Sequence, residues 1–348
     1  TSFNCSNVGN NTVTLTVTDV KGNSSSNTAV VTVEDNINPT VLFTQNITIQ
    51  LNASGTASIS TSDIDNGSFD NCGIASMTLS QVNFDCSHLG NNTVVYTVVD
   101  NNGNTVTQNV TVTVLDNINP VAIGQNITVS LDANGILVLD PALIDNGSFD
   151  VCDFTLTASP NIFGPANIGV NNVILVITDS SGNSHYTVVQ VTITDNVNPV
   201  VNTQNITINL DSNGLASITA NQVNNGSTDN AQIASMSVSP DSFTCDDLGA
   251  NTVTLTVTDT SGNNNTGTAT VTVVDNINPT ITAPAAVTTT TNTACTATGV
   301  TLGTPVTADN CSVASVTNDA PASFPIGNTT VTWTVEDGSG NTATATQV

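Results

Sequence analysis

The chain has almost no basic side chains. It carries 27 acidic residues but a single Lys or Arg, Lys21, and its formal net charge is −26. This composition argues against nucleic acid as a partner, because proteins bind phosphate groups mainly through Lys and Arg. It also leaves almost every carboxylate without a side-chain ion pair. The negative charge must therefore be met by solvent ions or by bound cations.

Long apolar runs and catalytic signatures are missing as well. No run of about 18 apolar residues occurs, so we expect no membrane-spanning segment in this chain. Neither a Gly-x-Ser-x-Gly motif, a His-rich metal motif nor a phosphate-binding loop is present. Paired carboxylates could serve glycoside hydrolysis, but the acidic residues recur alike along the chain, which favours an architectural role. We expect that the protein is not an enzyme.

A repeated pentapeptide is the most informative feature that is present. Asp-Asn-Ile-Asn-Pro, once with Val in place of Ile, recurs at intervals of about 80 residues, and such a fixed period indicates tandem repeats. The copies begin at Asp35, Asp116, Asp195 and Asp275. They predict five segments: the C-terminal half of a sandwich repeat at 1–34, and whole repeats at 35–115, 116–194, 195–274 and 275–348.

Apolar and polar residues alternate strictly in the clearest strand of each segment. In the first segment Val13, Leu15 and Val17 alternate with Thr, and Asp19–Asn23 follows as a short hairpin turn with Gly at its tight position. The Leu15 position becomes Tyr96, Leu175, Leu255 and Trp333 in the later segments, and we expect it to fill the core throughout. No helix is predicted. About six or seven short strands per repeat predict an all-β fold of tandem immunoglobulin-like β-sandwiches in an extended rod.

Two pairs of cysteines fall within single segments. Cys72 with Cys86, and Cys295 with Cys311, would each close a loop of roughly 15 residues and stabilise it by about 3 kcal/mol. We predict both disulfides. Disulfides favour an oxidising, extracellular setting over the cytosol.

The other cysteines lack a partner in this scheme. Cys5 aligns with Cys86, so its partner would precede the given residues. Cys152 aligns with Cys72, but its partner position holds Pro165. Cys245 aligns with Cys86, but its partner position holds Ala231. We therefore predict that Cys152 and Cys245 are free thiols.

Aspartate is concentrated at the places that a sandwich of this class brings together. The linker, the loop between the second and third strands, and the last hairpin turn all lie at one pole. Carboxylates that converge there without Lys or Arg repel one another, and calcium, which takes six to eight oxygen ligands, is the natural neutraliser. Asp at the hairpin also fits turn formation alone. The predicted calcium ligands are Asp35, Asp65, Asp70, Asp100, Asp116, Asp145, Asp150, Asp179, Asp195, Asp229, Asp259, Asp275, Asp309 and Asp337.

Three resemblances support this interpretation. The linker Glu34–Pro39 resembles the calcium-binding linker of cadherins, although the upstream Asp-Arg-Glu element is missing. The last segment resembles hyalin-type (HYR) repeats through Cys295, the corner Ala308–Cys311 and the strand Gly327–Trp333. The middle segments are similar to tandem repeats of giant adhesins on gliding bacteria, exported by the type IX route. These resemblances imply surface display and adhesion.

The leading functional hypothesis is a structural and adhesive segment of a large bacterial cell-surface or extracellular filament, with calcium stiffening its junctions. Its partner would be a surface ligand or a neighbouring subunit. One alternative is an array of polysaccharide-binding modules, which needs exposed aromatic side chains. A second is a polymerising subunit that donates a strand to its neighbour.

Overall fold

The computed structural model describes residues 1–348. Its regular structure is almost entirely β-strand, which confirms the all-β prediction, and every sheet draws its strands from one of the five segments. Two compact units make up the chain. The first comprises Thr1–Ile127, Leu139–Asn161 and Asn171–Val191, and the second comprises Thr128–Val138, Ile162–Val170 and Thr192–Val348.

The first segment is a single hairpin that follows one 3-10 turn, η1 (Cys5–Asn7). Strands β1 (Gly9–Thr18) and β2 (Ser24–Val33) pair antiparallel along their whole length. Asp19 opens the turn between them as predicted, since its Oδ1 accepts hydrogen bonds from the N–H groups of Lys21 and Asn23, each at 2.9 Å.

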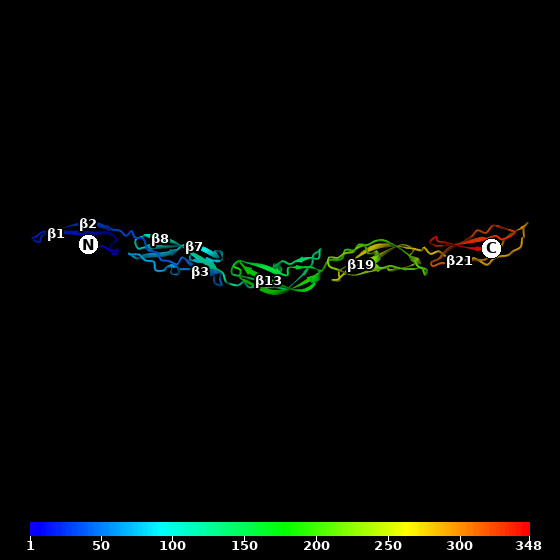
Figure 1. Cartoon of the computed structure of the whole chain (residues 1–348), viewed down its shortest axis with the longest axis horizontal. Helices are drawn as coiled ribbons and strands as arrows, with labels where there is room; N and C mark the ends of the chain where they lie inside the picture. Colours follow the sequence, from blue (N-terminus) through cyan, green and yellow to red (C-terminus); the bar gives the residue numbers. More distant parts are fainter. The chain divides into compact units, whose positions relative to one another are not determined.

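The second segment is a two-layered sandwich. Its elements are β3 (Asn46–Gln50), β4 (Thr56–Ser58), α1 (Thr61–Ile64), β5 (Ile74–Leu79), β6 (Asn83–Asp85), η2 (Cys86–His88), β7 (Gly90–Asp100) and β8 (Thr105–Leu115). The main sheet has the order β3-β8-β7-β5, with β3 parallel to β8 and the other pairs antiparallel. Figure 1 labels β3, β7 and β8 of this sheet. The opposite layer is the β4–β6 pair, with the helical turn α1 beside it in sequence.

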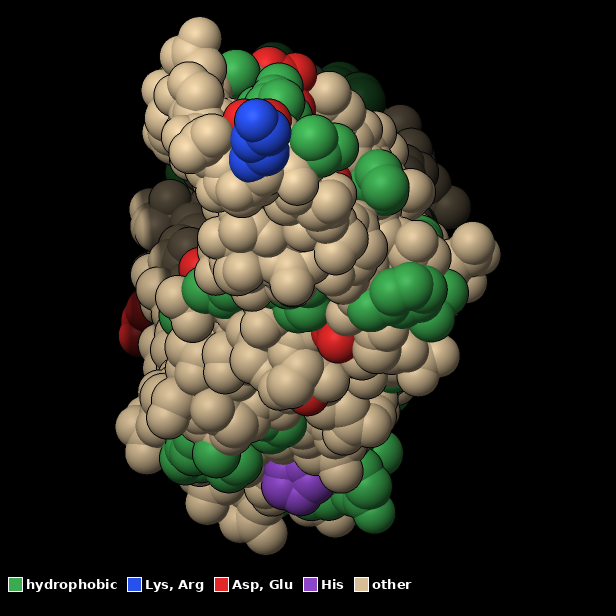
Figure 2. Space-filling model, turned by 90° about the vertical axis from the view of Figure 1, so that its left-hand side faces the viewer, with side chains coloured by type: hydrophobic (Ala, Val, Ile, Leu, Met, Phe, Trp, Pro, Cys, Tyr) green, Lys and Arg blue, Asp and Glu red, His purple; other side chains and the backbone are tan.

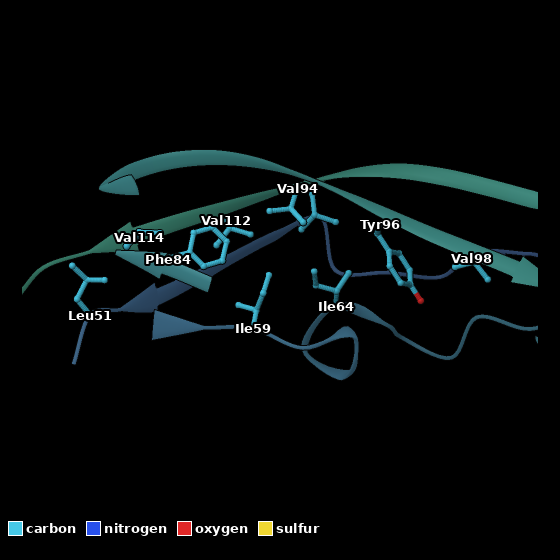
Figure 3. Packing of buried hydrophobic residues seen from close by; sticks show 10 residues of the cluster. Leu51, Ile59, Ile64, Phe84, Val94, Tyr96, Val98, Val112 and Val114 are labelled. Carbon is cyan, nitrogen blue, oxygen red and sulfur yellow. The ribbon is translucent and has the colours of Figure 1, made fainter. Parts of the chain in front are cut away.

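The core of this sandwich is aliphatic with two aromatic rings. Alternate residues of β7 and β8 point inward, and Val94, Tyr96 and Val98 are fully buried. Figure 3 shows Phe84 beside Val112, with Tyr96 further along the core. Because successive side chains of a strand point to opposite faces, the Val/Thr alternation places the apolar set in this core and leaves Thr outside.

The third segment repeats the same order of elements. They are β9 (Ile127–Ser130), β10 (Leu137–Val138), α2 (Pro141–Ile144), β11 (Phe154–Ser159), β12 (Ile162–Phe163), η3 (Pro165–Asn167), β13 (Gly169–Asp179) and β14 (Ser184–Thr194). Its sheets are ordered β11-β13-β14-β9 and β10-β12.

The fourth segment has the same topology again. It contains β15 (Ile206–Asn209), β16 (Leu215–Ser217), α3 (Ala220–Val223), β17 (Ile233–Ser239), β18 (Ser242–Thr244), η4 (Cys245–Asp247), β19 (Gly249–Asp259) and β20 (Asn264–Val274). The main sheet is β15-β20-β19-β17, with β15 parallel to β20, and β16 pairs with β18.

The fifth segment is a variant with three small sheets. Its strands are β21 (Thr280–Thr282), β22 (Thr296–Thr298), β23 (Val306–Ala308), β24 (Val313–Asn318), β25 (Ser323–Pro325), β26 (Val331–Asp337) and β27 (Thr342–Gln347). They pair as β21-β23, β22-β25 and β24-β26-β27. Trp333 of β26 is buried, and its Nε1–H donates to Oε1 of Gln347 at 2.9 Å.

Two expectations from the sequence are wrong in detail. Leu15 does not fill a core: it is 70% exposed, whereas Tyr96 at the aligned position is 0% exposed. The reason is that residues 1–34 contain only the hairpin, so no second layer covers its apolar face. The chain also contains one-turn helices in the loop after the second strand, such as Thr61–Ile64, which Ser60 begins as a capping box with Asp63.

The acidic side chains are divided between the surface and the buried parts of the structure. The face in Figure 2 consists mostly of neutral polar side chains and backbone, with acidic side chains at a few separate places. Seven aspartates are buried: Asp100, Asp116, Asp179, Asp195, Asp259, Asp275 and Asp337. No helix in the structure has the length and apolar character that crossing a membrane requires.

Candidate metal centres at the repeat junctions

Each hairpin aspartate is tied into its own turn. Asp100 Oδ1 accepts hydrogen bonds from the N–H groups of Asn102 and Asn104, both at 2.8 Å, and its Oδ2 accepts one from Asn104 Nδ2 at 2.7 Å. The same arrangement recurs at Asp179, Asp259 and Asp337. Turn formation therefore explains part of what these residues do.

The asparagine of the same turn fastens the hairpin to the linker. Its Nδ2 also donates to the carbonyl of the first linker residue, at 3.0 Å in every whole segment. The pairs are Asn104 with Asp35, Asn183 with Asp116, Asn263 with Asp195, and Asn341 with Asp275. We call this contact the linker latch. It fixes the position of the linker aspartate against the last hairpin.

The linker aspartates point a carboxylate oxygen into a closed space. Asp116, Asp195 and Asp275 are 3%, 4% and 3% exposed. In each, Oδ1 accepts a hydrogen bond from the N–H two residues ahead, at 2.9–3.1 Å. The Oδ2 atoms of all three are buried without a hydrogen-bond partner.

A second aspartate reaches the same place from the loop before the third strand, which we call the corner. Its Oδ2 accepts the N–H two residues ahead, at 2.8–2.9 Å. The pairs are Asp70 with Cys72, Asp150 with Cys152, Asp229 with Ala231, and Asp309 with Cys311. The Oδ1 atoms of Asp150, Asp229 and Asp309 are buried and have no partner.

These side chains form four clusters, one in each whole segment. The ligand atoms within each cluster lie within 4.8 Å of one another. The clusters are Asp35, Asp70 and Asp100; Asp116, Asp150 and Cys152; Asp195, Asp229 and Asp259; and Asp275, Asp309 and Asp337. The predicted convergence of linker, corner and hairpin is therefore present, with Asp179 as the exception.

A neutral amide oxygen completes two of the clusters. The corner residue after Asp229 is Asn230, and the one after Asp309 is Asn310. Their Oδ1 atoms are buried without a partner. Each Nδ2 donates to Oδ1 of the linker aspartate, at 3.2 and 3.1 Å. In the third segment this position is Val151, which offers no side-chain oxygen.

The donor set fits a hard divalent cation. A buried carboxylate oxygen without a partner is strongly unfavourable, and two such oxygens of like charge lie close together in three of the clusters. Carboxylate and amide oxygens are the ligands that calcium prefers. A hairpin carboxylate oxygen that accepts hydrogen bonds still keeps lone pairs that can face a cation. The residues present therefore fit calcium.

Besides Asp179, two of the predicted ligands lie outside the clusters. Asp65 accepts hydrogen bonds from the Tyr96 hydroxyl and the Ser68 N–H, each at 3.0 Å. Burial raises the pKa of Asp65, but the hydrogen bonds from Ser68 and Tyr96 outweigh this effect. The pKa of Asp65 therefore lies below its ordinary value. Asp145 likewise accepts the Ser148 N–H at 3.1 Å. Neither belongs to a cluster, because each carboxylate is used inside its own loop.

The structure also corrects the predicted disulfides. The bonds are Cys5–Cys72, Cys86–Cys152 and Cys245–Cys311, and Cys295 is a free, exposed thiol. The expected pairs Cys72–Cys86 and Cys295–Cys311 are wrong, and so is the expectation that Cys152 and Cys245 are free. The cysteine of the 3-10 turn and the cysteine of the corner lie at opposite poles of one segment. Each therefore meets its partner in the adjacent segment.

The sequence held a signal for this pairing. The bonded cysteines are separated by 67, 66 and 66 residues. The two missing cysteines, at Pro165 and Ala231, have the same separation and would have been partners of each other. Because both positions lack cysteine, their replacement indicates the loss of one disulfide across a junction. It does not indicate that two separate disulfides each lost one cysteine. The thiol in the third segment's cluster is likewise not a free ligand, since Cys152 is bonded to Cys86.

Comparison with protein families places the last segment in a known class of repeat. Residues 274–347 match the HYR domain. The chain is 30% identical over 364 residues to "Hyalin" of Strongylocentrotus purpuratus, covering 97% of this chain and 30% of the relative. It is 33% identical over 281 residues to "Hyalin" of Lytechinus variegatus, covering 73% of this chain and 51% of the relative.

The chain also aligns with solved structures of cadherin repeats. Protocadherin Gamma B2 extracellular cadherin domains 1–5 aligns over 97% of this chain and 85% of that chain, at 11% identity and a TM-score of 0.27. Drosophila N-cadherin EC1–4 aligns over 75% and 83%, at 13% identity and a TM-score of 0.26.

The fold and the clusters define a tandem β-sandwich repeat protein with acidic junctions. The sequence matches support, more particularly, a hyalin-type HYR repeat protein. The chain spans about a third and about half of the two hyalins that it matches, at 30% and 51% of their lengths.

Proposed function

We propose that this chain is an adhesive and structural segment of an extracellular repeat protein, and that calcium stiffens the junctions between its repeats. The observation that carries the proposal is the set of buried, unpartnered oxygens of the linker and corner residues. Three disulfides between neighbouring segments favour an oxidising, extracellular location. A non-catalytic role fits sites that recur once per repeat.

The clusters can act by joining parts of the chain that would otherwise repel. A cation held by the linker, corner and hairpin of one repeat neutralises carboxylates that no Lys or Arg can reach. Since the linker leads directly from the previous repeat, a bound cation would restrict the angle between neighbours. The HYR match and the hyalin relatives support an adhesive extracellular repeat protein. A filament on the surface of gliding bacteria is a more specific prediction, which these matches do not support.

Calcium content and thermal stability test the proposal together. After equilibrium dialysis against calcium, the folded chain should retain the ion, and chelation should lower its melting temperature. Binding to the folded state alone adds about 2.7 kcal/mol when calcium is at 100 times Kd. If dialysis retains no calcium and chelator leaves melting unchanged, the aspartates only form turns and the proposal is wrong.

Two variants make this test specific to the clusters. Asp229→Ala removes a ligand with a buried, unpartnered oxygen, and it should reduce bound calcium by one ion per chain at most. Asp145→Ala is the matched control, because Asp145 lies in a related loop but outside the clusters. Equal calcium loss in the two variants would contradict the assignment.

The alternatives have less support from the described side chains. Polysaccharide binding needs exposed aromatic rings that line one binding face. Tyr96 and Trp333 are buried, and the exposed rings of Phe69, Phe149, Phe154 and Tyr186 belong to two of the five segments. Donation of a strand to a neighbouring subunit stays a prediction.

A further inference from the structure

The junctions at Asp195 and Asp275 have the same contact geometry. At the Asp275 junction, a Cβ built on Gly214 would lie 2.6 Å from Cys245 Sγ and 2.8 Å from the Asn310 carbonyl oxygen. At the Asp195 junction, a Cβ on Gly135 would meet the Asn230 carbonyl and would lie 3.5 Å from Pro165 Cγ. Both glycines have a positive φ, of +72° and +75°. Pro165 therefore occupies the place of Cys245.

The two junctions differ in what fastens them. At the Asp275 junction, the Cys245–Cys311 disulfide joins the fourth segment to the corner of the fifth. At the Asp195 junction, the corner carries Ala231 and no covalent bond is possible. The contact across it is a hydrogen bond from Asn230 Nδ2 to the Asp132 carbonyl, at 2.9 Å. The corresponding bond from Asn310 to the Asp211 carbonyl is longer, at 3.4 Å.

The side chain that spans the Asp195 junction also faces the cluster. Asn230 Nδ2 donates to Asp132 and to Asp195 Oδ1, while its Oδ1 is buried without a partner among the carboxylates. A cation bound to Asn230 Oδ1 would fix the amide plane. It would thereby hold Nδ2 on the Asp132 carbonyl of the preceding segment. Cation binding and the contact across the junction are then coupled through one side chain.

We infer that the junction at Asp195 is a calcium-dependent hinge, whereas the junctions with a disulfide stay fastened when calcium is removed. This inference rests on the proposed function, because it assumes that the clusters bind calcium. It adds that one junction of the four in the chain responds differently. Reduction of the disulfides would make the Asp275 junction behave like the Asp195 junction.

Hydrogen exchange at two matched peptides tests the inference. Residues 229–232 and 309–312 are the corresponding corners, and each contains an N–H that donates to a corner carboxylate, at 2.9 Å in both. Exchange is followed by mass spectrometry in the full chain, with calcium and after chelation. We expect chelation to speed exchange about tenfold at 229–232 and less than about threefold at 309–312.

Two double variants exchange the fastenings. Pro165→Cys with Ala231→Cys should form a new disulfide, which mass spectrometry detects before and after reduction. In this variant, chelation should speed hydrogen exchange at 229–232 no more than it does at 309–312. In the variant with Cys245→Ser and Cys311→Ser, chelation should speed hydrogen exchange at 309–312 about tenfold. The second variant keeps the test decisive if the new disulfide does not form.

The possible outcomes separate this inference from the proposed function. If calcium binds but chelation loosens both corners equally, the hinge is wrong and the proposed function stands. If neither corner responds and dialysis retains no calcium, the proposed function itself fails. If the corner at 309–312 stays protected after Cys245→Ser and Cys311→Ser, the disulfide is not what protects it, and the hinge is again overturned.

Discussion

The junctions at Asp195 and Asp275 share the same arrangement of carboxylates and corner amide but differ in covalent connection. Each has a buried linker carboxylate, a buried corner carboxylate and a corner amide with an unpartnered oxygen. A disulfide crosses only the second of the two. The cluster is therefore built by contacts within a repeat, including the linker latch, and does not need the disulfide for its shape. The disulfide adds a connection to the previous repeat.

The junction at Asp116 shows the opposite combination. It has the Cys86–Cys152 disulfide but carries Val151 where the other corners have asparagine. The corner asparagine and the disulfide therefore occur independently of each other, and each of the four junctions has at least one of them. The junction, rather than the repeat, is therefore the unit in which such a connection is gained or lost.

Removal of the disulfide should have the largest effect on the comparison. Cys245→Ser with Cys311→Ser opens a loop whose ends are 66 residues apart. We expect the free energy of unfolding of the enclosed stretch to fall by about 4 kcal/mol in the chain-entropy model. Calorimetry in the absence of reductant measures the change. Cys295→Ser is the control, since this thiol is free and exposed. An equal effect of the two substitutions would contradict the role of the disulfide.

Exchange of the corner residues should have the next largest effect. Asn230→Val removes an amide oxygen from the Asp195 cluster, and Val151→Asn adds one beside Asp150. We expect calcium affinity to fall about tenfold in the first variant and to rise in the second, since tenfold corresponds to about 1.4 kcal/mol. Isothermal titration calorimetry gives both affinities. The corner amide is not a ligand if neither substitution changes calcium binding.

Loss of the linker latch should have a smaller effect and should not distinguish the two junctions. Asn263→Ala and Asn341→Ala each remove the hydrogen bond to the linker carbonyl, at 3.0 Å in both, together with the Nδ2 bond to the hairpin carboxylate, at 2.7 and 2.8 Å. We expect each to lower the free energy of unfolding by about 1 kcal/mol. Ser261→Ala, in the same turn, is the control for Asn263→Ala. A clearly larger loss at one junction would show that the latch depends on the disulfide.

Acid should produce the smallest change, through the hairpin turn at the Asp275 junction. Burial raises the pKa of Asp337, but hydrogen bonds from Asn341 and Ser339 outweigh this effect. The pKa of Asp337 therefore lies below its ordinary value. The carboxylate therefore stabilises the fold above the ordinary pKa of about 3.9, and this contribution is lost as pH falls through the lower folded-state pKa. In chelator, the difference in melting temperature between the protein and Asp337→Asn should narrow below about pH 4. A difference that stays constant down to lower pH would exclude this role.

Much of the fold follows from local patterns in the sequence. The Val/Thr alternation defines β7 and β8 because burial on one face of a strand selects every second residue. The Asp-to-Asn spacing of the hairpin turn also recurs in every segment, and it marks the linker latch once the linker is known to lie beside the turn. The approach of linker, corner and hairpin aspartates was predictable for the same reason, since the sandwich class fixes which loops share a pole.

The errors in the cysteine pairing arose because a disulfide between segments depends on two segments at once. Alignment within a segment placed Cys72 and Cys86 in one repeat, but it gave no distance between them across the sandwich. The corner asparagine was missed because Asn is abundant, and its value depends on burial beside a carboxylate. The joint presence of Pro165 and Ala231 was the usable signal, because paired losses at a fixed separation report a contact.

Under tension the disulfides would divide the chain into loaded and shielded stretches. Force applied at the two ends passes through each S–S bond, so residues 6–71, 87–151 and 246–310 lie on bypassed loops. The longest stretch that carries force is 153–244, and it contains the junction without a disulfide. If residues 153–244 unfolded under force, they would extend by roughly 300 Å before the disulfides at either end limited further extension. The one pair of missing cysteines thus places a long extensible element between two stretches whose lengthening is limited by sulfur bridges.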